Sequence, residues 1–274
     1  MTPFLKSMHI YPVKSCHRVD LDAADLEPWG LAGDRRWLIT DLEGRQRTQR
    51  VLPRMALIRP TYGKNGRLRL RAPGMSPDLE LSPPRRREGA AEAAVSVWSF
   101  TGPAARAGRV ADEWVSTFLG EPSMLVHMDD TSVRPTNPKH SRAQDRVSFA
   151  DGYPLLLTSA ASLAALGDWI TRMGADPVPM TRFRPNVVVE GTEPWAEERW
   201  RRVRIGGQVL RMAKPCARCV MTTVDPELGV FAGQQPLRAL RKHHRADKDV
   251  VFGVNLIPDS TGRIKVGEDF EVVE

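Results

Sequence analysis

Short apolar segments separated by turns recur along almost the whole chain and constrain its fold most strongly. Residues 67–72 (RLRLRA) alternate arginine and leucine, and this period of two buries one face of a strand while exposing the other. Residues 55–66 supply the first arm and the GKNG turn of the same hairpin. Gly206-Gly207 lies between two further strand-like runs and is a two-residue hairpin signal. Many short strands favour a sheet that closes into a barrel, because closure hides the strand edges.

Other apolar runs predict further strands. After a turn at Gly44, residues 41–49 are expected to return as the second arm of a hairpin with residues 35–40. The remaining strands are expected at 7–13, 78–82, 94–100, 123–128, 154–159, 186–191, 250–257 and 262–274.

Only three segments have a helical pattern. In the first, Val110, Trp114, Val115 and Phe118 fall on one face, and Gly120 ends the helix. The second covers 161–173, where Thr158 or Ser159 can cap the first turn, and the third covers 236–244 with a proline in its first turn. The balance indicates a β-rich α+β protein. The phosphate-binding motifs of doubly wound nucleotide folds are missing from the sequence.

Residues 129–146 lack an apolar period and contain two prolines. This pattern predicts a long, mobile surface loop near a domain junction.

The 274 residues suffice for one large or two medium domains, with a net charge of +7 and a pI of about 9.7. This charge favours anionic partners, although an arginine-rich surface explains it equally well. Nucleic acid is not expected, because the basic runs lack interleaved aromatic residues and no DNA-binding motif is present.

No segment has the length and hydrophobicity of a membrane span or a secretory signal. Three cysteines do not make a disulfide framework, so a cytoplasmic location is expected.

Two of these cysteines, Cys216 and Cys219, lie together in KPCARCVMTT. A structural zinc site needs four ligands, whereas the sequence has no second cysteine pair, and His243 and His244 are adjacent. A redox pair would open a helix after a βαβ strand, but this pair follows a hairpin. The alternatives are one soft thiolate offered to a metal-containing cofactor, or two small buried side chains.

Three other segments carry groups suited to an anion: Lys14-Ser15, Arg35, and Arg184 with Asn186. An ammonium, a hydroxyl and a bidentate guanidinium are common ligands of phosphate. Taken singly, each segment fits a surface ion pair or a turn. Together they indicate a site for a large, polar, anionic cofactor with a metal at one end.

Five motifs in this order carry a family resemblance. YPVKS (11–15), GDRRW (33–37), FRPN (183–186), CARC (216–219) and TTVDP (222–226) resemble the MOSC family, and in particular its amidoxime-reducing members. The resemblance extends from residue 10 to the GRIKVGEDF segment. It implies a β-barrel-like N-terminal domain (1–125) packed on a MOSC β-barrel domain with a few helices (126–274).

The resemblance also implies a molybdenum cofactor, in which molybdopterin supplies two sulfurs and a protein cysteine a third. The family's metal ligand, which is also its catalytic cysteine, falls on Cys219. Ala217 replaces a serine common in relatives, and Gly152 and Tyr153 replace residues with hydroxyl groups, so backbone contacts are expected there. The implied cofactor-binding residues are Lys14, Ser15, Arg35, Gly152, Tyr153, Arg184, Asn186, Ala217 and Arg218.

The implied activity is a molybdenum-dependent oxidoreductase that reduces small N-hydroxylated compounds from N–OH to N–H. Asp225 is a candidate proton relay, although an aspartate before a proline more commonly forms a turn. The sequence lacks a four-cysteine iron–sulfur set, and no flavin, NAD or pyridoxal phosphate site is expected. Electrons would therefore come from a separate ferredoxin, flavodoxin or reductase. The alternatives are a sulfur carrier with a persulfide on Cys219 or Cys216, and a non-catalytic cofactor-binding module.

Overall fold

The largest sheet lies mostly in the C-terminal half of the chain but takes two strands from the N-terminal region. The computed structural model describes residues 2–274. In this sheet β1 (Phe4–Ile10) pairs with β2 (Val19–Leu21) on one side and β13 (Val187–Glu190) on the other. The order then continues through β12 (Leu155–Ser159), β19 (Asp249–Pro258), β15 (Gln208–Ala217), β14 (Arg202–Ile205) and β21 (Phe270–Val272), while β18 (Arg245–Ala246) pairs with β19.

Backbone hydrogen bonds join β1 to the segment that leads into β21 and close this sheet into a barrel. The Leu5 N–H donates to Glu268 O at 2.9 Å, and the Gly267 N–H donates to Leu5 O at 2.8 Å. Apolar side chains from β1, β12, β13, β14, β19 and β21 fill the interior. Closure removes the unpaired edges of the sheet, as the sequence predicts. A small sheet of β20 (Gly262–Lys265), β3 (Ala23–Glu27) and β4 (Gly30–Leu31) lies beside it.

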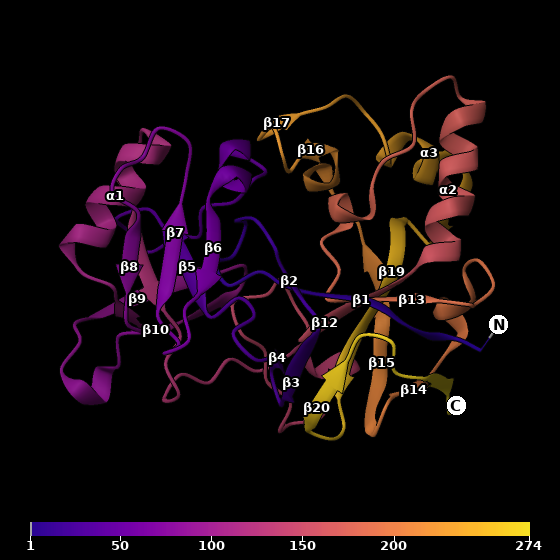
Figure 1. The fold of residues 1–274 in the computed structure, drawn as a ribbon, viewed down its shortest axis with the longest axis horizontal. Helices are drawn as coiled ribbons and strands as arrows, with labels where there is room; N and C mark the ends of the chain where they lie inside the picture. The colour runs from indigo at the N-terminus through magenta and orange to yellow at the C-terminus, as the bar shows by residue number, and fades with distance from the viewer. Residues whose placement is uncertain (1) are drawn as a thin grey trace.

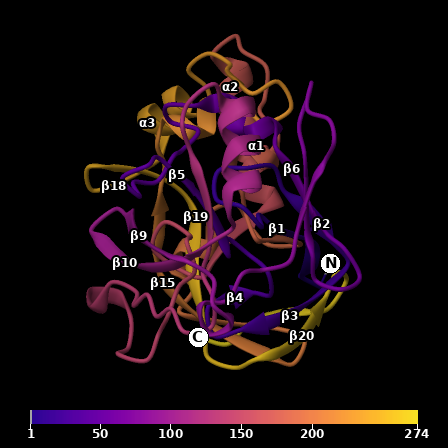
Figure 2. The same ribbon diagram turned by 90° about the vertical axis from the view of Figure 1, so that its left-hand side faces the viewer.

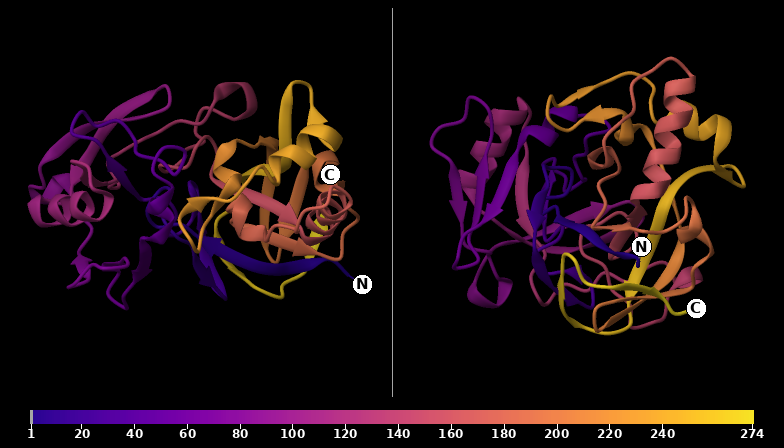
Figure 3. Two further views of the ribbon diagram at one scale, coloured as in Figure 1. Left: turned by 90° about the horizontal axis from the view of Figure 1, so that it is seen from above. Right: turned by 45° about the vertical axis from the view of Figure 1, so that its right-hand side comes forward.

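The N-terminal part contains two further antiparallel sheets. One has the order β5 (Trp37–Thr40), β11 (Met124–His127), β10 (Phe100–Arg106), β9 (Glu92–Val97), and the other β6 (Arg59–Tyr62), β7 (Leu68–Arg71), β8 (Leu79–Leu81). Helix α1 (Arg109–Leu119) packs into their shared core and lies on the side that faces away from the barrel (Figures 1 and 2). The two parts lie side by side, and both chain termini lie in the barrel part (Figure 3).

Two helices cover the barrel part. Helix α2 (Ala160–Arg172) follows β12 directly, and the Ser159 hydroxyl accepts a hydrogen bond from the Ala161 N–H, as expected of the cap. Helix α3 (Leu237–His243) packs against α2, and the two share an apolar cluster with Phe183 and Phe252. The short pair β16 (Val224–Asp225) and β17 (Val230–Phe231) lies between the cysteine segment and α3. No helix among residues 2–274 is long and apolar enough to span a membrane.

The β-rich α+β class and the three helices are confirmed, and several local predictions are corrected. Residues 41–49 form a turn with isolated bridges instead of a second strand. Strand β10 was not predicted, because Gly102 and Pro103 interrupt its pattern. In α1 the side chain of Val110 is 66% exposed, and Ala111 is buried instead. The domain boundary at residue 125 stays a prediction.

Candidate functional site

A cavity of about 770 Å³ opens where the two parts of the chain meet. Its lining comes from the segment after β1, the turn before β5, the β9–β10 turn, the loop before β12, the segment before β13, and the cysteine segment at the end of β15. All predicted cofactor-binding residues line it: Lys14, Ser15, Arg35, Gly152, Tyr153, Arg184, Asn186, Ala217, Arg218 and Cys219. Segments far apart in sequence thus share one chamber, and the roles of these residues in binding stay predictions.

Lys14 is a deeply buried cation of the cavity wall. Its Nζ donates to Phe149 O at 2.8 Å and forms a short ion pair with Asp151. Burial lowers the pKa of Lys14 to about 8, although the Asp151 carboxylate acts in the opposite direction. A buried ammonium with one carboxylate partner and an open cavity beside it is well placed to bind an anion.

Left-handed backbone conformations concentrate around this cavity. Ser15, Arg35 and Arg184 have φ angles of 64°, 47° and 56°, and Trp98 has 56°. Within residues 2–274 only six non-glycine residues have positive φ, so four of the six line one cavity. Such conformations each cost about 1–3 kcal/mol and persist where the surroundings enforce them, often at functional sites.

The predicted phosphate and pterin residues form one network. The guanidinium carbons of Arg35 and Arg184 each lie 4.1 Å from the centroid of the Tyr11 ring. Arg35 Nη1 donates to Asn186 Oδ1 at 2.9 Å and to the buried Asp34 carboxylate at 2.6 Å. Burial, together with the charge of Arg35, lowers the pKa of Arg184 to about 10, and the Tyr11 ring opposes this shift. Two cations held this closely favour an anionic ligand between or beside them.

The cysteine segment presents two sulfurs, each of which accepts a hydrogen bond from a guanidinium. Strand β15 extends as far as Ala217, and Cys219 precedes a single 3₁₀ turn at 220–223. Arg218 Nη1 donates to Cys216 Sγ at 2.9 Å, and Arg50 Nε donates to Cys219 Sγ at 3.3 Å. Cys16 is fully buried elsewhere, where burial raises the pKa of its thiol to about 12. Among residues 2–274, no three His, Cys, Asp or Glu side chains gather as a metal-binding group.

Sequence reasoning missed Arg50. Its Nη2 bonds to Asp151 Oδ2 at 3.0 Å, and its guanidinium carbon lies 4.7 Å from the centroid of the Trp98 ring. Asp151 thereby joins Lys14 to the arginine that contacts Cys219. Residue 50 follows a polar segment without any motif, so the sequence carried no signal for it.

The segment 129–146 was predicted as a mobile surface loop, but its middle forms part of the cavity wall. Arg134 is buried and donates from Nη1 to Ser148 O at 2.8 Å and from Nη2 to Asp151 O at 3.0 Å. Burial lowers the pKa of Arg134 to about 10. Its Arg134-Pro135 pair matches the Arg-Pro of the FRPN motif, the one sequence signal that could have identified it.

Asp225 lies beside the cavity but not in its lining. Its carboxylate pairs with Arg182 at 3.1 Å and accepts hydrogen bonds from the N–H groups of Glu227 and Leu228 at 2.9 and 3.1 Å. These bonds form the turn that the Asp-Pro pair predicts. Arg182, the ion-pair partner of this carboxylate, does line the cavity. A proton-relay role for Asp225 stays a prediction.

The donor set of the cavity fits a large anionic ligand with a soft metal. Among residues 2–274 a single carboxylate, that of Asp151, lines it, together with eight cationic side chains. The Nε atoms of Arg182 and Arg218 are buried and have no hydrogen-bond partner within the described chain. Thiols suit soft metals, and guanidiniums suit phosphate. The eight cations are Lys14, Arg35, Arg50, Arg134, Arg182, Arg184, Lys214 and Arg218.

Comparison with known proteins finds similarity over both parts of the chain. The profile of the MOSC N-terminal beta barrel domain matches residues 2–122, and that of the MOSC domain matches residues 144–271. The chain is 33% identical to mitochondrial amidoxime-reducing component 1 of Xenopus laevis, over 94% of this chain and 79% of that protein. It is 32% identical to the Homo sapiens protein of the same name, over 94% and 80%. Molybdenum cofactor sulfurase of Oryza sativa subsp. japonica is 29% identical over 92% of this chain and 32% of its own length. Both domain matches and these identities establish that the chain belongs to the MOSC family, with an N-terminal MOSC β-barrel domain followed by a MOSC domain.

Proposed function

We propose that the protein is a molybdenum-cofactor-dependent oxidoreductase that reduces N-hydroxylated compounds with electrons from a separate donor protein. The observation that carries the proposal is that eight cationic side chains and Cys219 line one cavity. The names of the amidoxime-reducing relatives, which align over almost the whole chain, support the N–OH substrate class.

The chemistry of each residue in the cavity suggests which part of the cofactor it would bind. Lys14, Ser15 and Arg35 would bind the phosphate end of the cofactor, and Arg184 with Asn186 its pterin. Cys219 would ligate the metal, and the Arg50 guanidinium would hold its sulfur in position. When bound, the cofactor supplies two-electron chemistry at the N–O bond, while the protein binds, orients and excludes water.

The cationic surroundings also bear on the substrate. Neutral amidoximes and anionic hydroxamic acids would enter a positively charged cavity without an electrostatic penalty, whereas a permanently cationic substrate would be repelled. Tyr153 lines the same cavity and is placed to limit the size of the entering molecule. The net charge of +7 suits an acidic electron donor such as a ferredoxin or flavodoxin.

The metal assignment is tested by elemental analysis after expression in a host that makes the cofactor. Wild type should carry close to one molybdenum per chain, Cys219→Ser should lose most of it, and Cys216→Ser should retain it. Equal metal in wild type and Cys219→Ser would refute the assignment. Turnover of an aryl amidoxime with dithionite-reduced viologen, but not with NADH alone, would support a separate donor.

The contact between Arg218 and Cys216 favours a second candidate function. The Arg218 guanidinium donates to Cys216 Sγ at 2.9 Å, and it would donate in the same way to a persulfide formed on this sulfur. The rice relative named molybdenum cofactor sulfurase supports this candidate. Sulfane sulfur on Cys216 or Cys219 in metal-free protein would favour the sulfur carrier. Molybdenum with no turnover of any N-hydroxylated compound would favour a non-catalytic cofactor-binding module.

A further inference from the structure

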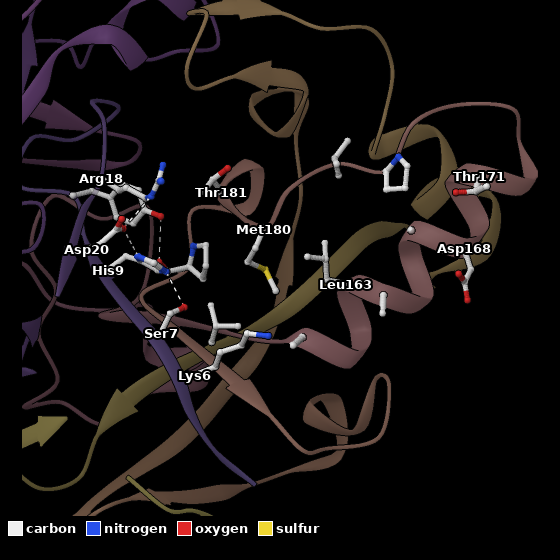
Figure 4. A pocket seen from close by; sticks show the side chains of 18 residues that line it. Lys6, Ser7, His9, Arg18, Asp20, Leu163, Asp168, Thr171, Met180 and Thr181 are labelled. Atoms are coloured by element: carbon white, nitrogen blue, oxygen red, sulfur yellow. Dashed lines mark hydrogen bonds and ion pairs between the residues drawn. The ribbon is translucent and has the colours of Figure 1, made fainter. Parts of the chain in front are cut away.

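A second cavity, of about 630 Å³, lies between strand β1 and helix α2 and shares no lining residue with the first. Figure 4 shows Lys6, Ser7 and His9 on one side of it and Leu163, Asp168 and Thr171 of α2 on the other. The facing surface of α2 carries small residues at one-turn spacing, and these leave room between helix and sheet. The small residues are Ala160, Ala164 and Gly167.

An irregularity in β1 determines which side chains face this cavity. The register with β13 shifts between Leu5 and Ser7, so one extra residue is inserted at Lys6. Leu5 and Met8, three residues apart, therefore both point into the barrel core, while Ser7 and His9 lie on the outer face. β-Bulges commonly re-aim side chains beside functional sites.

The outer face carries a hydrogen-bonded Ser–His–Asp chain. Ser7 Oγ lies 3.0 Å from His9 Nε2, and His9 Nδ1 lies 2.6 Å from Asp20 Oδ1. All three residues line the cavity, and dashed lines in Figure 4 mark both contacts. A carboxylate only accepts, so Nδ1 carries the proton and Nε2 of the neutral ring accepts from the Ser7 hydroxyl.

The residues around Ser7, His9 and Asp20 favour a neutral His9 that can accept the proton of the Ser7 hydroxyl. Burial lowers the pKa of His9, although Asp20 acts in the opposite direction, so the imidazole is neutral and able to take a proton at pH 7. Arg18 Nε donates to Asp20 Oδ1 at 3.0 Å and holds the carboxylate in place. Both distances in the chain lie within the range expected for a nucleophile, its base and the group that orients the base.

We propose that this cavity is a second active site, which binds esters of apolar acyl chains and hydrolyses them at Ser7. The apolar side chains of Leu163, Val178 and Met180 line the same cavity as Ser7 and would accept the acyl chain. A volume of about 630 Å³ falls within the size range of small-molecule sites. The site uses no cofactor and is independent of the cysteine cavity.

The reaction balances without any redox partner. Ser7 Oγ bonds to the ester carbonyl carbon while its proton passes to His9 Nε2. The bond from that carbon to the alcohol oxygen then breaks, and His9 returns the proton to the leaving alcohol. Water attacks the acyl-serine by the same route, so that the carboxylic acid leaves and the Ser7 hydroxyl is restored.

The test uses the full-length protein, an alkyl fluorophosphonate and p-nitrophenyl hexanoate. We expect peptide mass spectrometry to find the phosphonate on Ser7, and Ser7→Ala to remove both label and ester turnover. His9→Gln should lower turnover about 100-fold or more, the range of general-base catalysis. Thr117→Ala, which removes an exposed hydroxyl of α1 in the other part of the chain, should react like wild type.

If the hydrogen bonds among Ser7, His9 and Asp20 only stabilise the fold, these experiments should give different results. His9 is opposite Asp20 in the β1–β2 register, so a purely structural link would show lower thermal stability in His9→Gln and no labelled serine in wild type. Ala164→Phe provides a variant at an exposed position that fills the cavity and should suppress labelling while the fold is retained. Absence of label on Ser7 in wild type, or equal ester turnover in Ser7→Ala, would overturn the proposal.

Discussion

Lys14 is a buried cation whose charge costs the cofactor-free protein stability. Its side chain is 6% exposed, and its pKa falls from the usual 10.5 to about 8. At about 1.4 kcal/mol per pKa unit, the difference corresponds to about 3 kcal/mol. Because the pKa is lower in the folded than in the unfolded chain, the full cost applies below pH 8 and disappears as the pH rises through 10.5.

Lys14→Met should therefore stabilise the cofactor-free protein. Asp151 is 52% exposed and keeps Arg50 as a partner, so loss of the bonds to Phe149 and Asp151 offsets only about 1 kcal/mol. This leaves a net gain of about 2 kcal/mol at pH 7. At pH 9.5 the wild-type lysine is largely neutral in the fold, so the gain should shrink to well under half. Urea unfolding at both pH values measures it. Lys6→Met, at a lysine whose side chain is 47% exposed, is the control and should change stability little.

The same substitution should lower the molybdenum content of protein made in a cofactor-producing host, because it removes a cation from the proposed phosphate site. Stability and binding would then change in opposite directions, as expected where a charge is kept for function. A loss of more than about 1 kcal/mol in Lys14→Met at pH 7 would mean that the Asp151 ion pair outweighs the burial cost and that Lys14 serves the fold. A gain that is the same at both pH values would refute the charge-burial argument.

Three further substitutions test the site and the barrel. Arg35→Lys keeps the charge but loses the paired bonds to Asp34 and Asn186, so molybdenum per chain, measured by elemental analysis, should fall while the melting temperature changes little. Gly253→Ala should destabilise the barrel by about 2 kcal/mol or more in thermal unfolding, because its φ is 72° and a Cβ would lie 2.5 Å from a backbone oxygen of β12. The control is Gly66→Ala, which has a similar φ but open space around it and should cost about 1 kcal/mol. Ser159→Ala should lower stability by about 1 kcal/mol in the same assay through loss of the α2 cap.

The fold was predictable where local pattern and tertiary environment agree. Leu68 and Leu70 are buried and Arg69 and Arg71 exposed, as the period of two requires. Strand β10 escaped prediction because pairing with β9 and β11 overrides its glycine and proline. The face of α1 was misjudged by one position, since Val110 lies in its first turn, before the helix meets the core.

Only those residues of the site that belong to sequence motifs could be predicted. Lys14, Arg35, Arg184 and Cys219 belong to recognisable segments, and the fold brings them together in one cavity. Arg50 reaches Cys219 across 169 sequence positions, and no local pattern encodes such a contact. The left-handed backbone conformations at non-glycine positions could not be predicted from the sequence either, because the tertiary fold imposes them.

The path of the N-terminal strand explains why the cavity depends on both parts of the chain. Strand β1 pairs with β13, and its neighbouring backbone bonds to the segment before β21, so residues 4–10 complete the barrel. The chain then leaves the barrel through Tyr11 and Lys14 and enters the other part, where the Lys14 N–H bonds to Trp37 O at 2.9 Å. The proposed phosphate-binding segment is therefore anchored in both sheets. A chain that began at residue 126 would lose this segment and would also leave β13 with an unpaired edge, so barrel closure and cofactor binding should fail together.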